Sequence, residues 1–255
     1  MKIIKDNELI LNTKVKELDI LDSFNFKCHK DIECYNMCCK NINIFLNPYD
    51  ILRLKNKLNI SSDEFLDKYT DVILREGNFF PDVLMKMKEA DQSCPFLNNE
   101  GCSIYNTRPD ACRYLPIEQG IKYDTSGSKS FIYFYKPPDF CCGINENENW
   151  TIKSWLEDQG VNMTNLTMSW GEFKAYFIDD PWGIEGPYGK KGKMAFMAIY
   201  NIDVFKDFLI NSSFLKRFKI KKTIIQKIKL DEKFLIKFAF DWVKYYLWGI
   251  SSKHF

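Results

Sequence analysis

Residues 28–39 are Cys-His-Lys-Asp-Ile-Glu-Cys-Tyr-Asn-Met-Cys-Cys and bring four thiols within twelve positions. The rest of the chain adds five more cysteines, and none follows residue 142. Thiolates are soft, anionic ligands, and four of them complete a tetrahedral zinc site or hold a four-iron cluster. Thiols confined to one part of the chain therefore predict a metal site. The nine cysteines are Cys28, Cys34, Cys38, Cys39, Cys94, Cys102, Cys112, Cys141 and Cys142.

The spacing of the cysteines leaves the number of metal centres open. Cys38 and Cys39 are adjacent, so their side chains diverge by about 100° in a helix or about 180° in a strand. They would most easily serve different metals or opposite sides of one loop. Nine cysteines allow two four-cysteine sites, or one such site with spare thiols. The intervals are neither the CxxC pairs of zinc ribbons nor the run of a ferredoxin, and they keep no single helical face, which favours a loop.

Composition and compartment decide which thiol chemistry applies. A chain of 255 residues with 45% hydrophobic and 27% charged residues is typical of a globular protein with one large domain or two modest ones. Charged residues interrupt the N-terminus too early for a signal peptide, and no apolar run approaches the roughly 20 residues of a membrane span. We therefore expect a soluble cytoplasmic protein, in which reduced thiols bind metal more often than they form disulfides. Disulfides and buried free cysteines are the alternatives.

Helix signals begin directly after the cysteine stretch. Asn47 followed by Pro48 has the form of an N-cap with proline at the first helical position, and apolar residues continue at helical spacing to Leu58. Ser61 and Glu64 have the spacing of a capping box, which predicts a second helix at once.

Strand signals accompany the later cysteines. The alternating pattern of residues 83–87 predicts a strand whose outer face is partly charged. Residues 94–105 predict a hairpin with a cysteine on each arm, because the turn sequence Asn-Asn-Glu-Gly lies between two apolar runs. The aromatic sequence of residues 131–136 predicts a further strand.

Two short helices are predicted near these strands. Asn106 or Thr107 is placed to cap a helix that begins near Pro109, which would set Cys112 about one turn inside it. Thr151 is placed to cap another helix, with apolar residues facing inward and a glycine as its stop.

The C-terminal part is predicted to be mostly helical. Helical patterns near residues 203–218 and 231–248 follow a glycine-rich loop at residues 181–192. The last pattern carries an aromatic stripe, which is more typical of a core or a dimer interface than of a ligand site. We therefore predict an α+β protein, with a small cysteine-rich metal-binding domain of short strands and helices at residues 1–145 and a mostly helical region at residues 146–255.

The charge is distributed unevenly along the chain. Residues 214–237 hold nine basic and two acidic side chains, a local charge of +7, which leaves −5 for the rest of a chain of net charge +2. We interpret this basic segment as a solvated helix face. Docking to nucleic acid is the weaker alternative, because the segment contains no recognisable nucleic-acid module.

Several segments, taken in order, resemble a known family. They are Cys-Pro-Phe-Leu at 94–97, Gly-Cys-Ser-Ile-Tyr at 101–105 and Arg-Pro-Asp-Ala-Cys-Arg-Tyr-Leu-Pro at 108–116. With the cysteine stretch and the sequence Asp-Ile-Leu-Arg-Leu at 50–54, they resemble the YkgJ-type cysteine-cluster family (CxxCxxCC), a zinc- or iron-chelating domain that includes the flagellin lysine N-methylases. The resemblance covers roughly residues 24–145.

The resemblance implies eight cysteine ligands. Cys142 is the extra thiol, because it stands where the family is expected to have proline. The first block also departs from the family pattern, since Tyr35 stands where a glycine is usual and the spacing is wider. The implied metal ligands are Cys28, Cys34, Cys38, Cys39, Cys94, Cys102, Cys112 and Cys141.

The resemblance also implies chemistry. For the flagellin methylases it implies an iron–sulfur cluster (4Fe-4S) with S-adenosylmethionine as methyl donor, so an enzyme of this kind would be a methyltransferase acting on a lysine of a protein substrate. Arg108 and Arg113 flank Cys112, and we expect them to bind the cofactor by offsetting its negative charge. For Arg108, a salt bridge that caps the hairpin is the alternative. The alternative is a non-enzymatic metal-binding module, which holds structural zinc or iron or delivers metal to a partner.

Independent support for methyl transfer is lacking in the sequence. The glycine-rich loop lacks the strand before it and the helix after it that a nucleotide fingerprint requires. The chain contains no CxxxCxxC triplet of radical enzymes, and no residue can be named as a base. His29 beside the cysteines is predicted to face solvent rather than ligate, and His254 is interpreted as part of the C-terminal tail.

Overall fold

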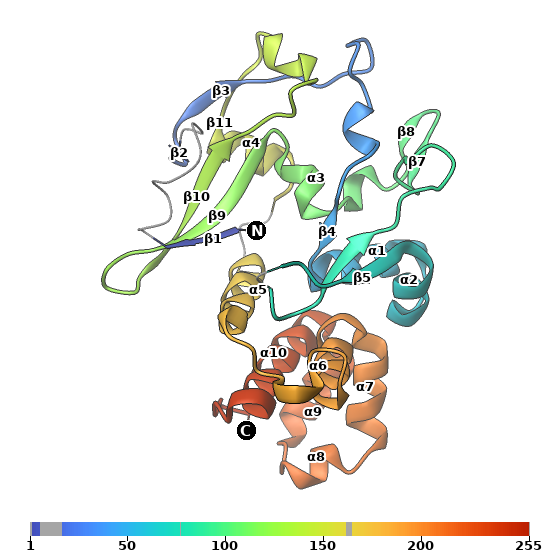
Figure 1. Ribbon diagram of the computed structural model, residues 1–255, viewed down its shortest axis with the longest axis vertical. Coiled ribbons are helices and arrows are strands. Elements are labelled where there is room, and N and C mark those ends of the chain that lie inside the picture. The colour runs from blue at the N-terminus through green and yellow to red at the C-terminus, as the bar shows by residue number, and fades with distance from the viewer. Residues whose placement is uncertain (1, 6–16, 77, 162–164, 255) are drawn as a thin grey trace. The chain divides into compact units, whose positions relative to one another are not determined.

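The contacts within the chain divide it into two compact units whose sequences interleave, and each is drawn in Figure 1. The computed structural model describes residues 2–5, 17–76, 78–161 and 165–254. The cysteine unit, which holds all nine cysteines, comprises Met1–Ile44 and Met87–Gly171, and the helical unit comprises Phe45–Lys86 and Glu172–Phe255. The expected boundary between residues 145 and 146 falls inside the cysteine unit and stays a prediction.

A four-stranded sheet with the strand order β1-β9-β10-β2 forms one part of the cysteine unit. β9 and β10 are antiparallel, with Ile121 opposite Phe131, and β1 runs parallel to β9 (Figure 1). The strand predicted from the aromatic run is therefore confirmed. These strands are β1 (Lys2–Lys5), β2 (Glu17–Leu18), β9 (Ile117–Tyr123) and β10 (Lys129–Tyr135), and a separate pair is formed by β3 (Ser23–Asn25) and β11 (Asn149–Thr151).

The apolar core of the cysteine unit includes residues of the helix α4 (Ile152–Asp158). Thr151 caps α4 as predicted, because its hydroxyl accepts the N–H of Ser154 at 3.1 Å. The apolar side of the helix then joins aromatic residues of the strands, including Phe24 on β3 and Tyr133 on β10. The buried core consists of Leu18, Phe24, Phe26, Tyr114, Ile117, Tyr133, Ile152, Trp155, Leu156 and Val161.

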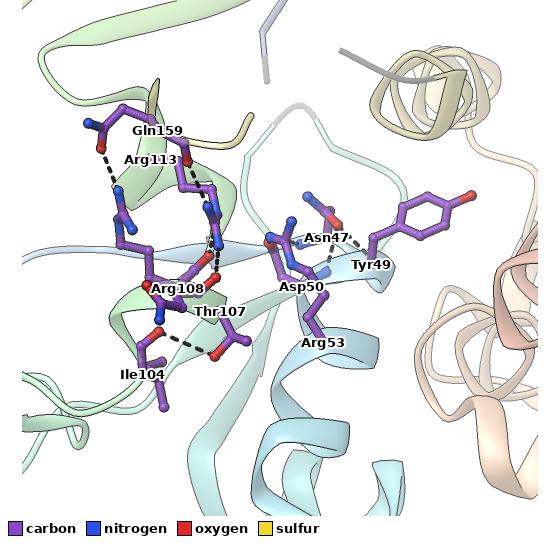
Figure 2. Close-up of polar contacts among 10 residues, drawn as sticks. Asn47, Tyr49, Asp50, Arg53, Ile104, Thr107, Arg108, Arg113 and Gln159 are labelled. Atoms are coloured by element: carbon purple, nitrogen blue, oxygen red, sulfur yellow. Dashed lines mark hydrogen bonds and ion pairs between the residues drawn. The ribbon is translucent and has the colours of Figure 1, made fainter. Parts of the chain in front are cut away.

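Most of the cysteines lie in turns and very short elements. The stretch at residues 28–39 consists of turns that end in a 3-10 helix, so the predicted loop is confirmed. The predicted hairpin and the short helix around Cys112 are present, but the predicted cap is wrong. Pro109 precedes that helix without a side-chain cap, because the Thr107 hydroxyl donates to the carbonyl of Ile104 at 3.2 Å (Figure 2). The elements are η1 (Met37–Cys39), β7 (Leu97–Asn98), β8 (Gly101–Cys102), η2 (Tyr105–Thr107), α3 (Asp110–Tyr114) and η3 (Cys142–Asn145).

The helical unit begins with two capped helices and a small sheet of order β4-β6-β5. The Asn47 side chain accepts the N–H groups of Tyr49 and Asp50 at 2.8 and 2.9 Å, which caps α1 as predicted (Figure 2). Ser61 accepts the N–H of Glu64 at 3.1 Å and starts α2, and the strand expected at residues 83–87 is β6. These elements are β4 (Phe45–Leu46), α1 (Pro48–Leu58), α2 (Ser62–Tyr69), β5 (Thr70–Ile73) and β6 (Asp82–Met85).

The C-terminal region is mostly helical, as expected. Leu235, Phe238 and Trp242 of the aromatic stripe on α10 are buried in the core, whereas Tyr246 is exposed. The predicted helix at 203–218 is interrupted at Ser212, where the backbone is extended. The elements are α5 (Asn165–Ala175), η4 (Tyr176–Ile178), η5 (Gly183–Glu185), α6 (Lys190–Tyr200), α7 (Ile202–Asn211), α8 (Phe214–Arg217), α9 (Lys222–Leu230) and α10 (Glu232–Trp248).

The whole architecture is a mixed α+β fold, which confirms the predicted class. Short strands and helices occupy the N-terminal part, and helices from α5 to α10 occupy the C-terminal region. Among the described helices, none is long and apolar enough to span a lipid bilayer.

Candidate metal centre

No disulfide bond joins any of the nine cysteines, all of which lie in the described part of the chain. Cys34 and Cys94 are buried, Cys28 is exposed, and the other six are partly exposed. Most of the thiols can therefore be reached from solvent by a metal ion.

The chain segments around Cys34 and Cys142 lie against each other. The N–H of Cys142 donates to the Cys34 sulfur at 3.0 Å, and the N–H of Lys27 donates to the carbonyl of Gly143 at 3.0 Å. Glycine permits this approach, because a Cβ at position 143 would lie 2.7 Å from the carbonyl oxygen of Lys27. The last two cysteines of the chain are thus held beside the start of the cysteine stretch.

The end of the cysteine stretch pairs with a different segment. The N–H of Cys94 donates to the carbonyl of Cys39 at 2.8 Å, and Lys40 forms an antiparallel bridge with Ser93. The β7–β8 hairpin follows and carries Cys102. Two ends of one twelve-residue stretch therefore contact two parts of the chain that are remote from each other in sequence.

Electrostatic contacts show which thiols are neighbours at the first end. Partial burial of the sulfur, together with the nearby thiols of Cys38, Cys34 and Cys141, raises the pKa of Cys28 to about 11. Burial also raises the pKa of Cys141, with smaller contributions from Cys34 and Cys38. A hydrogen bond with Cys34 is the main reason that the pKa of Cys142 is raised. These thiols share one local environment.

A second environment surrounds the other end. A hydrogen bond with Cys38 raises the pKa of Cys39, as do burial and the neighbouring thiols Cys38, Cys112 and Cys94. Burial raises the pKa of Cys94, and the neighbouring Cys102 adds to this effect. The same Cys38–Cys39 hydrogen bond lowers the pKa of Cys38 to about 7, so Cys38 is the member of that pair that ionises first.

Backbone donors support the thiolate form at two of these cysteines. The N–H groups two and three residues further along the chain hydrogen-bond to the sulfurs of both Cys94 and Cys141, and they lower the thiol pKa against the effect of burial. The Lys88 ammonium lies near Cys94 and acts in the same direction. N–H groups and a cation that stabilise thiolates are the surroundings that a thiolate-bound metal requires. The sequence pattern does not indicate Lys88, because its proximity to Cys94 depends on the turn between them.

The donor set fits a soft metal in its chemistry, although the side chains are not arranged around a ready centre. In the part of the chain that the structure describes, no three His, Cys, Asp or Glu side chains converge closely enough to hold one metal ion. Zinc bound by four thiolates has Zn–S distances of about 2.3 Å. Binding would therefore require the thiols of each environment to turn toward a common point.

Arg108 and Arg113, expected to bind the cofactor, are engaged in local backbone contacts (Figure 2). Arg108 donates to the carbonyl of Tyr105 at 2.6 Å and also to the side chain of Gln159. Arg113 donates to the carbonyls of Asn106, Arg108 and Gln159. Both side chains are buried, and these bonds fix the loop around α3. A role for either arginine in binding a cofactor stays a prediction.

The two histidines have different surroundings. His29 is partly exposed, and its Nε2 lies 3.6 Å from a carboxylate oxygen of Glu146. The His254 side chain is only 5% exposed and packs against the rings of Phe234 and Phe238. His254 follows the end of α10 and belongs to the C-terminal tail, as interpreted. Its burial depends on helix contacts that the sequence pattern does not display.

The glycine-rich loop of the helical unit folds back closely on its own residues. The N–H of Lys190, at the start of α6, donates to the Glu185 carboxylate at 3.0 Å. A Cβ on Gly189 would lie 2.4 Å from the Cβ of Glu185, and one on Gly192 would lie 1.8 Å from the carbonyl oxygen of Pro187. These glycines therefore allow the chain to fold closely on itself.

The comparison with protein families agrees with this part of the structure. Residues 27–142 match the CxxCxxCC family, whose description is "Putative zinc- or iron-chelating domain". No curated protein and no solved structure matches the chain significantly. The match contains every cysteine and confirms the resemblance found in the sequence. Residues 27–142, somewhat less than half of the chain, are thus similar to the CxxCxxCC family.

Proposed function

We propose that the protein binds a metal centre through the thiols of the cysteine unit. The observation that carries this proposal is the meeting of cysteines from distant parts of the chain. Cys142 donates its N–H to the sulfur of Cys34, and Cys94 donates its N–H to the carbonyl of Cys39. Thiols dominate these environments, and thiolates favour zinc and iron–sulfur clusters over hard cations.

Between these occupants, we propose the iron–sulfur cluster. Its support is the resemblance to a family that includes cluster-dependent methylases. When bound, a 4Fe-4S cluster supplies an electron-rich group that four thiolates hold. The chain would contribute the ligands, the N–H donors beside Cys94 and Cys141, and the positive charge of Lys88.

Metal analysis of the full chain, purified without oxygen, tests this proposal. We expect iron and acid-labile sulfide in equal amounts, with about four of each per cluster, and a broad visible absorption. A matched variant with Cys38→Ser and Cys39→Ser should lose most of the metal, whereas Ser103→Ala beside Cys102 should keep it. Zinc without sulfide would contradict the iron–sulfur assignment and favour the structural or metal-delivery alternative. Absence of iron and zinc from the unaltered chain, before and after reconstitution, would contradict metal binding itself.

Methyl transfer to a protein lysine is a finer proposal that rests on the family resemblance alone. The cluster-loaded protein would have to bind S-adenosylmethionine. A neutral lysine amine would then attack its methyl carbon in line, the sulfonium S–C bond would break to release S-adenosylhomocysteine, and the methylated ammonium would lose its proton to solvent. Calorimetric titration of metal-loaded protein with S-adenosylmethionine tests the first requirement. Heat of binding that disappears with the metal supports methyl transfer, whereas no heat from micromolar to millimolar donor contradicts it and leaves a non-enzymatic metal module.

A further inference from the structure

The adjacent residues Cys38 and Cys39 face different partners. At the start of the cysteine stretch, the segment that ends at Gly143 hydrogen-bonds to Lys27 and to the sulfur of Cys34. At the end of the stretch, Cys94 hydrogen-bonds to the backbone of Cys39. The stretch is therefore held between two separate segments.

The first group of thiols belongs to the side of Cys38. Cys28 has Cys38, Cys34 and Cys141 as its electrostatic neighbours, and Cys141 has Cys34 and Cys38. The hydrogen bond from the Cys142 N–H to Cys34 holds the same segments together. Cys28 and Cys141 are thus each close to both Cys34 and Cys38, and these four thiols form the first group.

The second group belongs to the side of Cys39. Cys39 has Cys112 and Cys94 as neighbours besides the adjacent Cys38, and Cys94 has Cys102. The β7–β8 hairpin brings Cys102 back toward Cys94. Leu97, which pairs with Cys102 in this hairpin, is only three residues after Cys94. Four thiols again form one set, and the Cys38–Cys39 hydrogen bond is the contact that joins it to the first.

Taking the proposed metal binding as its basis, we infer that the protein holds two separate four-thiol metal centres. The first is ligated by Cys28, Cys34, Cys38 and Cys141, and the second by Cys39, Cys94, Cys102 and Cys112. Cys142 ligates neither centre and contributes its backbone N–H to the sulfur of Cys34.

Ligand number and charge both agree with this division. Four thiolates complete one zinc ion or one cubane, so eight thiols exceed what a single centre can use. Zinc with four thiolates has a net charge of about −2, and each centre would need its own donors. Each set of thiols has such donors. Backbone N–H groups point at the sulfur of Cys141 in the first set and at the sulfur of Cys94 in the second. Divergent side chains at two adjacent positions supply one ligand to each centre.

Titration of the reduced, metal-free full chain with Co²⁺ tests the division, because thiolate-bound cobalt is visible by its absorption. The unaltered chain should bind two equivalents. The pair Cys28→Ser and Cys141→Ser should bind one, and so should the pair Cys102→Ser and Cys112→Ser. In each pair, the remaining cobalt should keep the tetrahedral four-thiolate spectrum, and the combined four substitutions should abolish it. Cys142→Ser is the matched control and should keep two equivalents.

Other results would overturn the division in distinguishable ways. Loss of both equivalents in either pair would show one interdependent centre, with metal binding itself retained in the unaltered chain. Loss of one equivalent in Cys142→Ser would make that thiol a ligand. Failure of the unaltered chain to bind cobalt, together with absence of iron and zinc, would instead contradict the proposed function. Far-ultraviolet circular dichroism would check in every variant that the helices of the helical unit remain folded.

Discussion

The longest helix of the helical unit and the cysteine-bearing segments of the cysteine unit differ in what stabilises them. α10 has 17 residues and buries Leu235, Phe238 and Trp242. In contrast, the segment that carries Cys94, Cys102 and Cys112 has no helix longer than the five residues of α3. Apolar burial of about 25 cal/mol per Å² stabilises the helix. In the cysteine segment the buried side chains include Phe96 and Ile104, but also the charged Arg108 and Arg113. We therefore expect the cysteine segments to depend on ligand bonds where the helices depend on a core.

The cysteine unit itself has an apolar core, but that core lies around the sheet and α4. Phe24, Phe26 and Trp155 form edge contacts there, with ring centroids 6.0 Å apart for Phe24–Trp155 and 5.2 Å apart for Phe26–Trp155. Of the nine cysteines, Cys141 is the one that packs against this core as a partly buried neighbour. Metal binding is therefore expected to order the cysteine loops, and the sheet should fold without it.

The largest effect is expected from removing an aromatic ring in the helical unit. Phe238→Ala should lower the free energy of unfolding by about 3–5 kcal/mol, because the side chain is fully buried. The exposed neighbour Lys237→Ala is the matched control and should change it by less than about 0.5 kcal/mol. Urea unfolding with and without metal measures both. If the loss of unfolding free energy in Phe238→Ala depended strongly on metal, the two units would not differ in what stabilises them.

The buried ion pair of the helical unit should give the next largest effect. Asp82 lies 3.0 Å from Lys174 and 2.7 Å from Arg75. Asp82→Asn should cost about 3 kcal/mol at neutral pH, because it leaves the buried Lys174 charge without its partner. The exposed Asp71→Asn on β5 is the control and should have little effect.

The same pair predicts a pH dependence. Burial opposes ionisation of Asp82, yet Lys174 and Arg75 together hold its pKa below the usual value. A lowered carboxyl pKa contributes stability that is present above the unfolded-state pKa, near 3.9, and is lost as pH falls toward the folded-state pKa. The difference between the unaltered chain and Asp82→Asn should therefore shrink below about pH 4. A difference that grows with acid would contradict this assignment.

Arg113 offers a test inside the cysteine unit. Arg113→Lys should lower stability by about 2 kcal/mol, because lysine cannot reach all three carbonyl groups that the guanidinium reaches. If the role of Arg113 is to make these backbone bonds, the metal content of the variant should remain unchanged. The exposed Lys153→Met serves as control. Metal loss with unchanged stability would instead support the predicted role of Arg113 in binding the cofactor.

The smallest effect is expected at the cap of α4. Thr151→Ala should cost about 1 kcal/mol, because the N–H of Ser154 loses its acceptor. Thr125→Ala, in the exposed turn between β9 and β10, is the matched control. Hydrogen exchange of α4 amides would measure the difference, and equal exchange in both variants would contradict the capping role of Thr151.

Caps were predictable because they depend on residues close in sequence. Asn47, Ser61 and Thr151 each bond to N–H groups within three positions, so their roles follow from local rules. The start of α6 was missed, because the lysine and glycine residues near its N-terminus resemble a loop. Gly192 is inside that helix because only glycine fits against the carbonyl of Pro187.

The site was predictable in its ligand types but not in its grouping. The eight cysteines were predictable as ligands from the sequence, which allows either one or two centres. The pairing of Lys40 with Ser93 and of Cys142 with Cys34 joins remote segments, and no periodicity indicates such contacts. Lys88 was missed for the same reason, since its proximity to Cys94 comes from the turn between them.

Hydrogen exchange of metal-loaded and chelator-treated protein tests most directly the claim that bound metal orders the cysteine loops while an apolar core orders the helices. We predict that amides of residues 28–41 and 92–112 lose protection when the metal is removed, whereas amides of α10 keep theirs. Unchanged protection of the cysteine segments after complete removal of metal would contradict the claim, and so would an equal loss in α10.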